Sequence, residues 1–313
     1  MIYAMQVPPS LTRGEKVAIL SPASVVKAEY IDGAADFLRS EGFEPMVMPH
    51  AKGPASGSYA ASDANRLSDI LEAYKDPSIR AILCARGGYG CNHLLPLIPP
   101  ALIASNPKWL IGFSDISALH ALSQHAGVVS LHSPMAKHLS TLPPDDISTR
   151  CMMRILTEGL PLQYDVPAHP LSTPGEAEGV LIGGNLAVIN GLSDTPFDPL
   201  RIPGPKILFI EDISEAIYAV ERMLIRLQLS GRLSEVTGII AGHFTEYRPD
   251  RNFQTMEEMI SQLLGNQNSA FHIPHIPIAL GFPAGHTDHN LPLPLGARAK
   301  LTVADGFTRL TAY

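Results

Sequence analysis

The feature of this sequence that most constrains its fold is the alternation of short apolar runs with helical patterns over the first 132 residues. Between the runs, apolar residues recur every three or four positions and so share one face of a helix; Asp63 is the expected cap of one such helix. Short buried strands joined by helices are typical of a parallel sheet covered on both faces. We predict its strands at Lys16–Ser24, Glu44–Met48, Arg80–Ala85, Trp109–Gly112 and Val128–Leu131.

Two unusual turns directly follow two of these predicted strands. They are Arg86–Gly90, which contains three glycines, and Gly112–Asp115, which presents a serine between a strand and a helix. In open parallel sheets, ligands bind beyond the carboxyl ends of the strands. We therefore expect both turns to lie at the same edge of the sheet, where a functional site would form.

The composition excludes several classes of protein. The chain is 45% hydrophobic and 17% charged, with a net charge of −7, which favours a globular core and argues against nucleic acid as a partner. No apolar run approaches the roughly 18 residues that a membrane span needs, and the N-terminus lacks a secretion signal. Three sparse cysteines (Cys84, Cys91 and Cys151) indicate free thiols and a reducing compartment. We predict a soluble, cytoplasmic protein.

The chain divides into two domains by its local composition. Prolines recur over residues 141–178, which we interpret as a linker with one short helix near residues 150–158. It would separate an N-terminal α/β domain, residues 1–140, from a C-terminal domain, residues 179–313. In the latter we predict strands at Lys206–Asp212 and Val236–His243, a helix after each (the second at Met256–Leu264), and short strands and loops at the end.

Ser114 permits two interpretations. Ser114 or Asp115 could cap a helix over Ile116–Gln124, because both residue types are favoured caps. Alternatively, Ser114 is a nucleophile on a sharp strand-to-helix turn, although the G-x-S-x-G pattern is absent because Ile116 takes its last position. The glycines of Arg86–Gly90 do not form a dinucleotide fingerprint, and their density suits backbone amides that bind an oxyanion. We assign no role to Arg86.

The acidic and basic candidates are also open to alternatives. Glu211 could favour a helix dipole from the end of its strand, but a buried glutamate there would need a partner such as a histidine. His286 could be structural or could join Asp288 and His289 in a metal cluster, although their spacing matches no strong zinc signature. Cys84 and Cys91 are not on a turn that would present a nucleophile, so we expect them to be core thiols.

Six segments together resemble the LD-carboxypeptidase family of serine peptidases, which includes muramoyl-tetrapeptide carboxypeptidases and microcin C7 self-immunity proteins. The resemblance extends over nearly the whole chain and favours Ser114 as a nucleophile. The segments are Ser21–Ser24, Ala85–Gly90, Gly112–His120, Gly183–Ile189, Ile207–Leu224 and Gly281–Ala297.

The resemblance implies a Ser–Glu–His triad of Ser114, Glu211 and His286, with the backbone amides of Gly88 and Asp115 as oxyanion donors. It implies an N-terminal doubly wound parallel sheet of the flavodoxin or class I amidotransferase type and a smaller, β-rich C-terminal domain. It also implies a homodimer and no metal or organic cofactor. The triad would assemble where the two domains meet.

The expected activity is hydrolysis of the L,D-amide bond that releases terminal D-alanine from murein tetrapeptides, as in peptidoglycan recycling. The alternatives are a self-immunity peptidase acting on a peptide–nucleotide antibiotic and a non-catalytic module that binds a small ligand. An amidotransferase-like hydrolase would need a cysteine at position 114. Two departures from the family pattern, Ser133 and Asp194, replace glycines, and Ser133 bears on the substrate pocket. Trp109, the only tryptophan, lies in a predicted strand, which favours the peptidoglycan branch.

Overall fold

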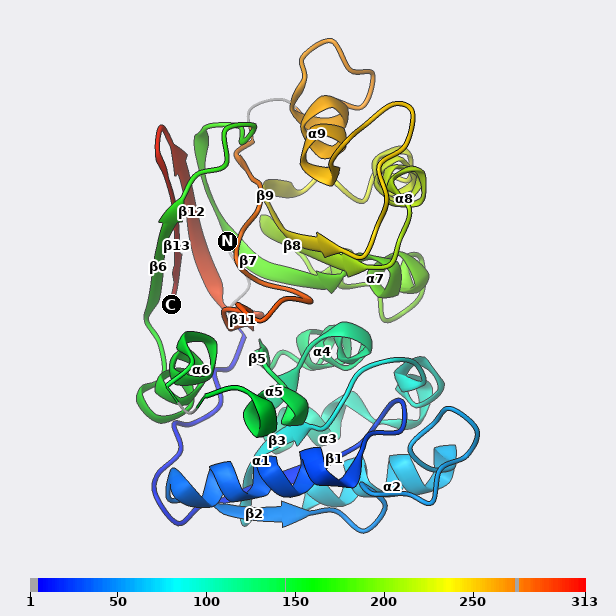
Figure 1. Ribbon diagram of the computed structural model, residues 1–313, viewed down its shortest axis with the longest axis vertical. Helices are drawn as coiled ribbons and strands as arrows, with labels where there is room; N and C mark the ends of the chain where they lie inside the picture. Colours follow the sequence, from blue (N-terminus) through cyan, green and yellow to red (C-terminus); the bar gives the residue numbers. More distant parts are fainter. Residues whose placement is uncertain (1–4, 144, 274–275) are drawn as a thin grey trace. The chain divides into compact units, whose positions relative to one another are not determined.

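The computed structural model describes residues 5–143, 145–273 and 276–313, and these form two compact units (Figure 1). The first unit consists of Met5–Gly159 together with Asn290–Leu295. The second consists of Leu160–His289 together with Gly296–Tyr313. A short C-terminal segment thus belongs to the first unit, although its neighbours on both sides belong to the second.

A six-stranded sheet forms the centre of the first unit, in the order β11-β5-β4-β3-β1-β2. Strands β1 to β5 run parallel, and β11 pairs antiparallel with β5. The order 2-1-3-4-5 is that of a doubly wound, flavodoxin-like sheet, which confirms the fold predicted for the N-terminal part. The strands are β1 (Lys16–Leu20), β2 (Glu44–Val47), β3 (Ile79–Cys84), β4 (Trp109–Gly112), β5 (Ser130–His132) and β11 (Leu293–Leu295).

Two helices of the first unit, α1 and α2, form where the apolar spacing predicts them. Helix α1 buries Ile31 and Leu38 on one face, and α2 is capped by Ser62, whose Oγ accepts from the Asn65 amide at 3.3 Å. The cap is therefore the residue before Asp63, the cap that we predicted. The helices are α1 (Ala28–Ser40), α2 (Asp63–Lys75), α3 (Pro100–Ser105), α4 (Ser117–His125), α5 (Ala136–Thr141) and α6 (Ile147–Glu158), with 3-10 turns η1 (Cys91–His93), η2 (Leu95–Leu97) and η3 (Ser114–Ile116).

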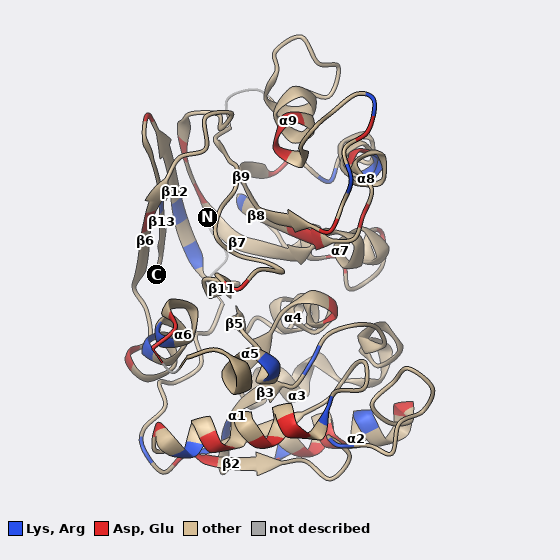
Figure 2. Cartoon of the chain, in the orientation of Figure 1, with Lys and Arg blue, Asp and Glu red and all other residues tan. Residues whose placement is uncertain are grey.

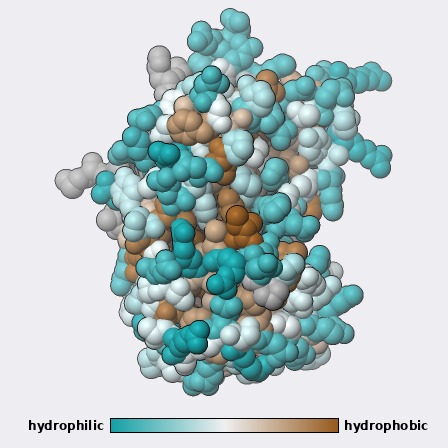
Figure 3. All heavy atoms as spheres, turned by 60° about the vertical axis from the view of Figure 1, so that its left-hand side comes forward, coloured by the Kyte–Doolittle hydropathy of each residue, from teal (hydrophilic) through white to brown (hydrophobic). Residues whose placement is uncertain are grey.

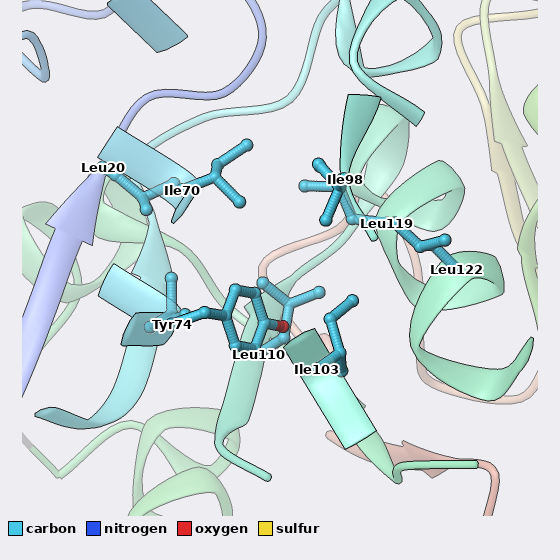
Figure 4. Close-up of a pocket in the computed structure, with 9 residues that line it drawn as sticks. Leu20, Ile70, Tyr74, Ile98, Ile103, Leu110, Leu119 and Leu122 are labelled. Atoms are coloured by element: carbon cyan, nitrogen blue, oxygen red, sulfur yellow. The ribbon is translucent and has the colours of Figure 1, made fainter. Parts of the chain in front are cut away.

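The core of the first unit is closely filled. Helices α2, α3 and α4 contribute apolar side chains that meet those of the central strands around a void of about 10 Å³ (Figure 4). Tyr74 is the one residue among the lining side chains that carries a hydroxyl, and burial raises the pKa of that hydroxyl above its usual value. A void of this size is at the lower limit for one water molecule, so the sheet that carries the two turns rests on a rigid support.

The second unit is built on a seven-stranded sheet in the order β10-β9-β8-β7-β12-β13-β6. Strands β7 to β10 are parallel, whereas β12, β13 and β6 continue the sheet in antiparallel fashion. Glu211 lies in β8, two residues before the last residue of that strand, near the strand end where we expected it. The strands are β6 (Leu162–Pro167), β7 (Gly175–Asn185), β8 (Lys206–Ile213), β9 (Val236–Thr245), β10 (Ile278–Ala279), β12 (Arg298–Ala304) and β13 (Phe307–Ala312).

Few helices accompany this second sheet. The predicted helix at Met256–Leu264 begins as expected but continues after Ile260 as a π-helical turn, Ser261–Gly265. The stretch that we interpreted as a linker contains α6, β6 and the start of β7. The helices are α7 (Leu186–Leu192), α8 (Ile217–Leu229) and α9 (Met256–Ile260), with a 3-10 turn at Pro199–Arg201.

Basic and acidic residues both occur along each of the two units (Figure 2). In the view of Figure 3 most of the surface is hydrophilic, and apolar residues appear in small groups. Among the described residues, none of the helices combines the length and apolar character that a membrane span requires.

Candidate active site

Ser114 occupies a strained position at the carboxyl end of β4. Its backbone φ is +66°, in the left-handed region that costs energy for any residue with a Cβ atom. It follows the buried strand after one residue and begins the 3-10 turn that leads into α4. The N-cap residue of α4 is Ile116, so neither Ser114 nor Asp115 occupies the cap position of that helix.

Gly87 lies directly against Ser114. A Cβ atom built on Gly87 would be 2.6 Å from the Ser114 Cβ and 2.9 Å from its Oγ, closer than real Cβ atoms approach other atoms. The glycine therefore allows the backbone after β3 to contact the serine hydroxyl. Sequence reasoning selected Gly88 and missed Gly87, because nothing in a run of glycines says which one needs the space.

The loop after β3 is attached to the loop after β1. The amide of Ser24 donates to the Gly87 carbonyl at 3.2 Å, and the Ser24 Oγ accepts from the Tyr89 amide at 3.0 Å. In a trans peptide the C=O and the following N–H point in opposite directions. Because β3 lies between β1 and β4, the N–H of Gly88 is directed away from Ser24, toward the side of β4 and Ser114.

Two buried polar side chains, those of Asp115 and His120, form hydrogen bonds at the turn. The Asp115 carboxylate is buried and accepts from the Cys91 amide at 2.9 Å; burial raises its pKa, although the bonds from Cys91 oppose this effect. His120 of α4 is also buried, with Nε2 2.8 Å from the Gly112 carbonyl and Nδ1 2.9 Å from Ser130 Oγ. Because a carbonyl only accepts, Nε2 carries the proton.

The thiols near this turn are unsuited to catalysis. Cys84 and Cys91 are both buried, and burial raises the pKa of each thiol above its ordinary value. A thiol is a weak nucleophile until it loses its proton. Their assignment as core thiols therefore agrees with their surroundings.

Glu211 and His286 form a close pair in the second unit. Glu211 Oε2 lies 2.6 Å from His286 Nδ1, and the Glu211 side chain is 0% exposed. The two residues are 75 positions apart in sequence. The structure thus brings together the two residues for which the sequence suggested a carboxylate–histidine pair, and Figure 2 shows acidic residues at the carboxyl end of β8. Ser114 belongs to the first unit.

The surroundings of the pair adjust the basicity of the imidazole. Burial lowers the pKa of His286, but the hydrogen bond and the charge of Glu211 outweigh burial, so the pKa lies above its ordinary value. Gly285 makes the approach possible: its φ is +118°, and a Cβ there would be 3.0 Å from Glu211 Oε2. A neutral imidazole held in this way is suited to accept a proton.

Asp212, the residue after Glu211, organises the start of α7 and was not selected from the sequence. Its buried carboxylate accepts from Asn185 Nδ2 and from the Ala187 amide, both at 2.8 Å. Burial raises the pKa of Asp212 to about 6, despite these bonds. The sequence offers no signal for this role, because adjacent acids in a strand normally face opposite sides of the sheet.

The metal interpretation of His286, Asp288 and His289 receives no support from the coordinates. Across residues 5–143, 145–273 and 276–313, no three His, Cys, Asp or Glu side chains are arranged to hold a metal ion. His286 instead contacts Glu211 through its Nδ1. Arg86 is exposed and donates to the Val25 carbonyl at 2.7 Å, which ties the loops after β3 and β1 together.

The two departures from glycine differ in their structural effect. Asp194 has a φ of +69°, which explains why glycine suits this position and why aspartate, which tolerates this region, can replace it. Its carboxylate pairs with Arg232. Ser133 is fully buried, and its backbone amide donates to the Gly112 carbonyl at 3.1 Å.

Comparisons with known proteins identify the family of this chain. Family models described as the LD-carboxypeptidase N-terminal and C-terminal domains match residues 17–133 and 178–301. A probable murein peptide carboxypeptidase from Bacillus subtilis is 33% identical, over 95% of this chain and 92% of its own.

One similar solved structure is that of a muramoyltetrapeptide carboxypeptidase from Oxalobacter formigenes, with a TM-score of 0.83, 30% identity, and coverage of 95% of this chain and 98% of that chain. The microcin C7 self-immunity protein of Escherichia coli is 27% identical, over 92% of this chain and 90% of its own. Both family models and the relatives extend over the two units. The chain therefore belongs to the LD-carboxypeptidase family of serine peptidases.

Proposed function

We propose that this protein is a serine carboxypeptidase that releases terminal D-alanine from murein tetrapeptides by cleaving the amide between an L-centre and D-alanine. The observation that carries the proposal is Ser114, a non-glycine residue held at φ +66° with its side chain against Gly87. Strain of this kind persists only where the surrounding structure imposes it, and it is common at active sites. The names of the relatives supply the substrate class.

His286 acts as the general base and Glu211 as the residue that orients it. Nδ1 of His286 faces Glu211, so Nε2 is the nitrogen that takes the proton from Ser114. The Glu211 carboxylate keeps the imidazole in the correct tautomer and stabilises the imidazolium that forms. These roles are the ones that the family resemblance implies for the three positions.

His286 is close in sequence to a residue of the first unit. His286 and Asn290 are four positions apart in sequence, and Asn290 belongs to the first unit. There, Asn290 Oδ1 lies 3.2 Å from Nε2 of His132 in β5, the strand next to β4.

The amides of Gly88 and Asp115 serve as oxyanion donors. The Gly88 N–H is directed toward the Ser114 side by the bond between Ser24 and the Gly87 carbonyl. Asp115 follows Ser114 at the start of a helical turn, where backbone amides are not yet used by the helix. Donors of this kind stabilise the charge that develops on the carbonyl oxygen, and loss of one costs about 10²–10³ in turnover.

The reaction then proceeds in two steps. The Ser114 Oγ attacks the carbonyl carbon as His286 takes its proton, and the C–N bond breaks as the same proton passes to the amine of D-alanine. The resulting ester on Ser114 is hydrolysed by water, which His286 deprotonates. The protein's own residues supply every proton transfer in this scheme.

Replacement of Ser114 tests the proposal. S114A should reduce the release of D-alanine from a murein tetrapeptide by about 10⁴-fold or more, because the residual rate would come only from binding and the oxyanion donors. S68A, on the exposed face of α2, is the matched control and should keep full activity. D-alanine is measured with a coupled oxidase assay, and circular dichroism checks the fold. Full activity in S114A would contradict the proposal.

The self-immunity alternative is less well supported by the structure. Trp109 is buried, with its indole N–H 3.1 Å from the Pro9 carbonyl, so it cannot stack on a nucleobase. Mass spectrometry after incubation with L,D- and D,D-linked muropeptides and a peptidyl nucleotide separates the candidates. A protein that binds these compounds but cleaves none would favour the non-catalytic alternative. A homodimer and a cytoplasmic location stay predictions, and light scattering tests the first.

A further inference from the structure

A fully buried arginine lies beside the loop that carries Gly88. Arg66 of α2 has a side chain that is 0% exposed. Arginine is rarely buried to this extent, because removal of its charge from water is costly unless partners surround it. Its surroundings therefore indicate what the side chain is for.

The Arg66 guanidinium binds two loops at the carboxyl edge of the first sheet. Nη1 donates to the carbonyl of Pro22, in the loop after β1, and to that of Gly90, in the loop after β3, at 3.0 Å for Gly90. Nη2 pairs with Asp63 at 2.5 Å, and the guanidinium carbon lies 5.0 Å from the centre of the Tyr59 ring. The partners thus hold the guanidinium in one orientation.

The peptide group between Gly90 and Cys91 is held on both sides. Arg66 binds its carbonyl, and the Asp115 carboxylate accepts from its N–H at 2.9 Å. Asp115 is the residue after Ser114. One peptide plane thereby connects Arg66 to the nucleophile turn, and a rotation of that plane would break both bonds at once.

The other end of the same loop is held through Ser24. Pro22, whose carbonyl Arg66 binds, lies two residues before Ser24, and Ser24 bonds both the Gly87 carbonyl and the Tyr89 amide. The four-residue segment from Gly87 to Gly90 is therefore fixed at one end by Arg66 directly and at the other through the loop of Ser24.

We propose that Arg66 is a positioning residue for catalysis, which holds the Gly87–Gly90 loop so that the Gly88 N–H points at the developing oxyanion. This inference rests on the proposed function. Arg66 touches no substrate and acts only through the loop. A guanidinium suits the task because its planar donors reach two carbonyls and a carboxylate together, whereas the lysine ammonium is a point charge on a flexible chain.

The test compares R66K and R66M with the wild type in kcat, KM and melting temperature. We expect kcat for D-alanine release to fall about 10- to 100-fold and KM to change less than threefold, because a misplaced oxyanion donor affects the transition state more than the bound substrate. R232M is the matched control, since Arg232 also pairs with carboxylates, those of Asp194 and Asp198, but lies in the second unit. It should lower the melting temperature and keep kcat.

A double-mutant cycle sharpens the test. S24A removes the hydroxyl that accepts from Tyr89, and R66K/S24A should lose less than the product of the two single losses, because both residues hold one loop. Unchanged kcat in R66K and R66M, or losses that multiply fully in the double variant, would overturn the inference. If R66M fails to fold, R66K decides alone.

Hydrogen exchange separates this inference from the proposed function. R66K should speed amide exchange in the peptide spanning Gly87–Cys91 while β4 stays protected, whatever reaction the enzyme performs. Unchanged exchange in that peptide would overturn the role of Arg66. If wild-type protein releases no D-alanine but R66K still loosens the loop, the proposed substrate is wrong and the role of Arg66 in holding the loop stands.

Discussion

The nucleophile turn of the first unit and the Glu211–His286 pair of the second are held in place by different physical means. Ser114 is positioned by its backbone: a left-handed φ, contact with Gly87, and buried polar supports beneath. The pair is positioned by side chains, through a 2.6 Å hydrogen bond in a buried setting. The nucleophile turn depends on shape and the Glu211–His286 pair depends on charge. Different substitutions should therefore disrupt the turn and the pair.

This difference makes each half vulnerable to a substitution that the other would tolerate. An added methyl group should disrupt the turn, which leaves no room for it, without any change in charge. Loss of one charge should disrupt the pair, although the shape of the site is unchanged.

After S114A, the largest effect should come from E211Q, which keeps the shape of the side chain and removes its charge. We expect kcat/KM to fall on the order of 10³–10⁴, as for amide replacement of the acid in related triads. The pKa of His286 should fall, because burial then acts without the opposing carboxylate. The rising limb of the pH–rate profile would therefore move to lower pH.

E235Q is the matched control for that experiment. Glu235 pairs with Lys206, at the opposite end of β8 from Glu211, and its side chain is half exposed. Its loss should leave the pH–rate profile unchanged. A limb that moves to higher pH in E211Q would show that the carboxylate does not raise the basicity of His286.

A methyl group at Gly87 should have the next largest effect. G87A places a Cβ 2.6 Å from the Ser114 Cβ, so either Ser114 or the loop must move. We expect a loss of about 10²–10³ in kcat from displacement of the oxyanion donor. G191A in α7 is the control, because a Cβ there meets nothing within 4 Å. Equal activity in the two variants would show that the close contact is not needed.

The smallest effect on activity, but a clear effect on stability, is expected from H120Q. Burial lowers the pKa of His120 to about 4, from an ordinary value of 6.5. Between these values the unfolded chain binds a proton more readily than the folded chain, so the free energy of unfolding of the wild type falls as the pH is lowered. H120Q lacks this contribution, which is roughly 3 kcal/mol at most.

Urea unfolding at several pH values measures that difference. The wild-type free energy of unfolding should decrease more steeply than that of H120Q between pH 6.5 and 4. If the free energy of unfolding depended on pH equally in the wild type and in H120Q, His120 would be protonated in the folded chain. The hydrogen bond from His120 to the Gly112 carbonyl is compatible with either protonation state.

The sequence predicts the first sheet well because its strands are short apolar runs, and burial on both faces leaves such runs few alternatives. Boundaries shift by a residue or two, as with Ser62 and Asp63, because both are good caps and lie side by side. The sequence does not predict that Asn290–Leu295 belongs to the first unit. A three-residue antiparallel strand has no periodicity long enough to detect.

The residues of the candidate site also differ in how well the sequence predicts them. A carboxylate–histidine pair can be expected from Glu211, because an acid beyond a run of apolar residues needs a partner. The left-handed backbone conformation of Ser114 cannot be expected from the sequence. Serine ordinarily avoids this conformation, and the contacts that impose it come from a different loop. The burial of Arg66 is the feature that the sequence predicts least. On an amphipathic helix, an arginine is normally expected at the surface.

The most direct measurement of the central claim is covalent labelling with a fluorophosphonate, followed by peptide mass spectrometry. The account predicts one adduct per chain, on the peptide that contains Ser114, and a labelling rate at least about 10²-fold lower in H286A. An adduct on a different residue, or an equal rate in H286A, would contradict a nucleophile at Ser114 activated by His286.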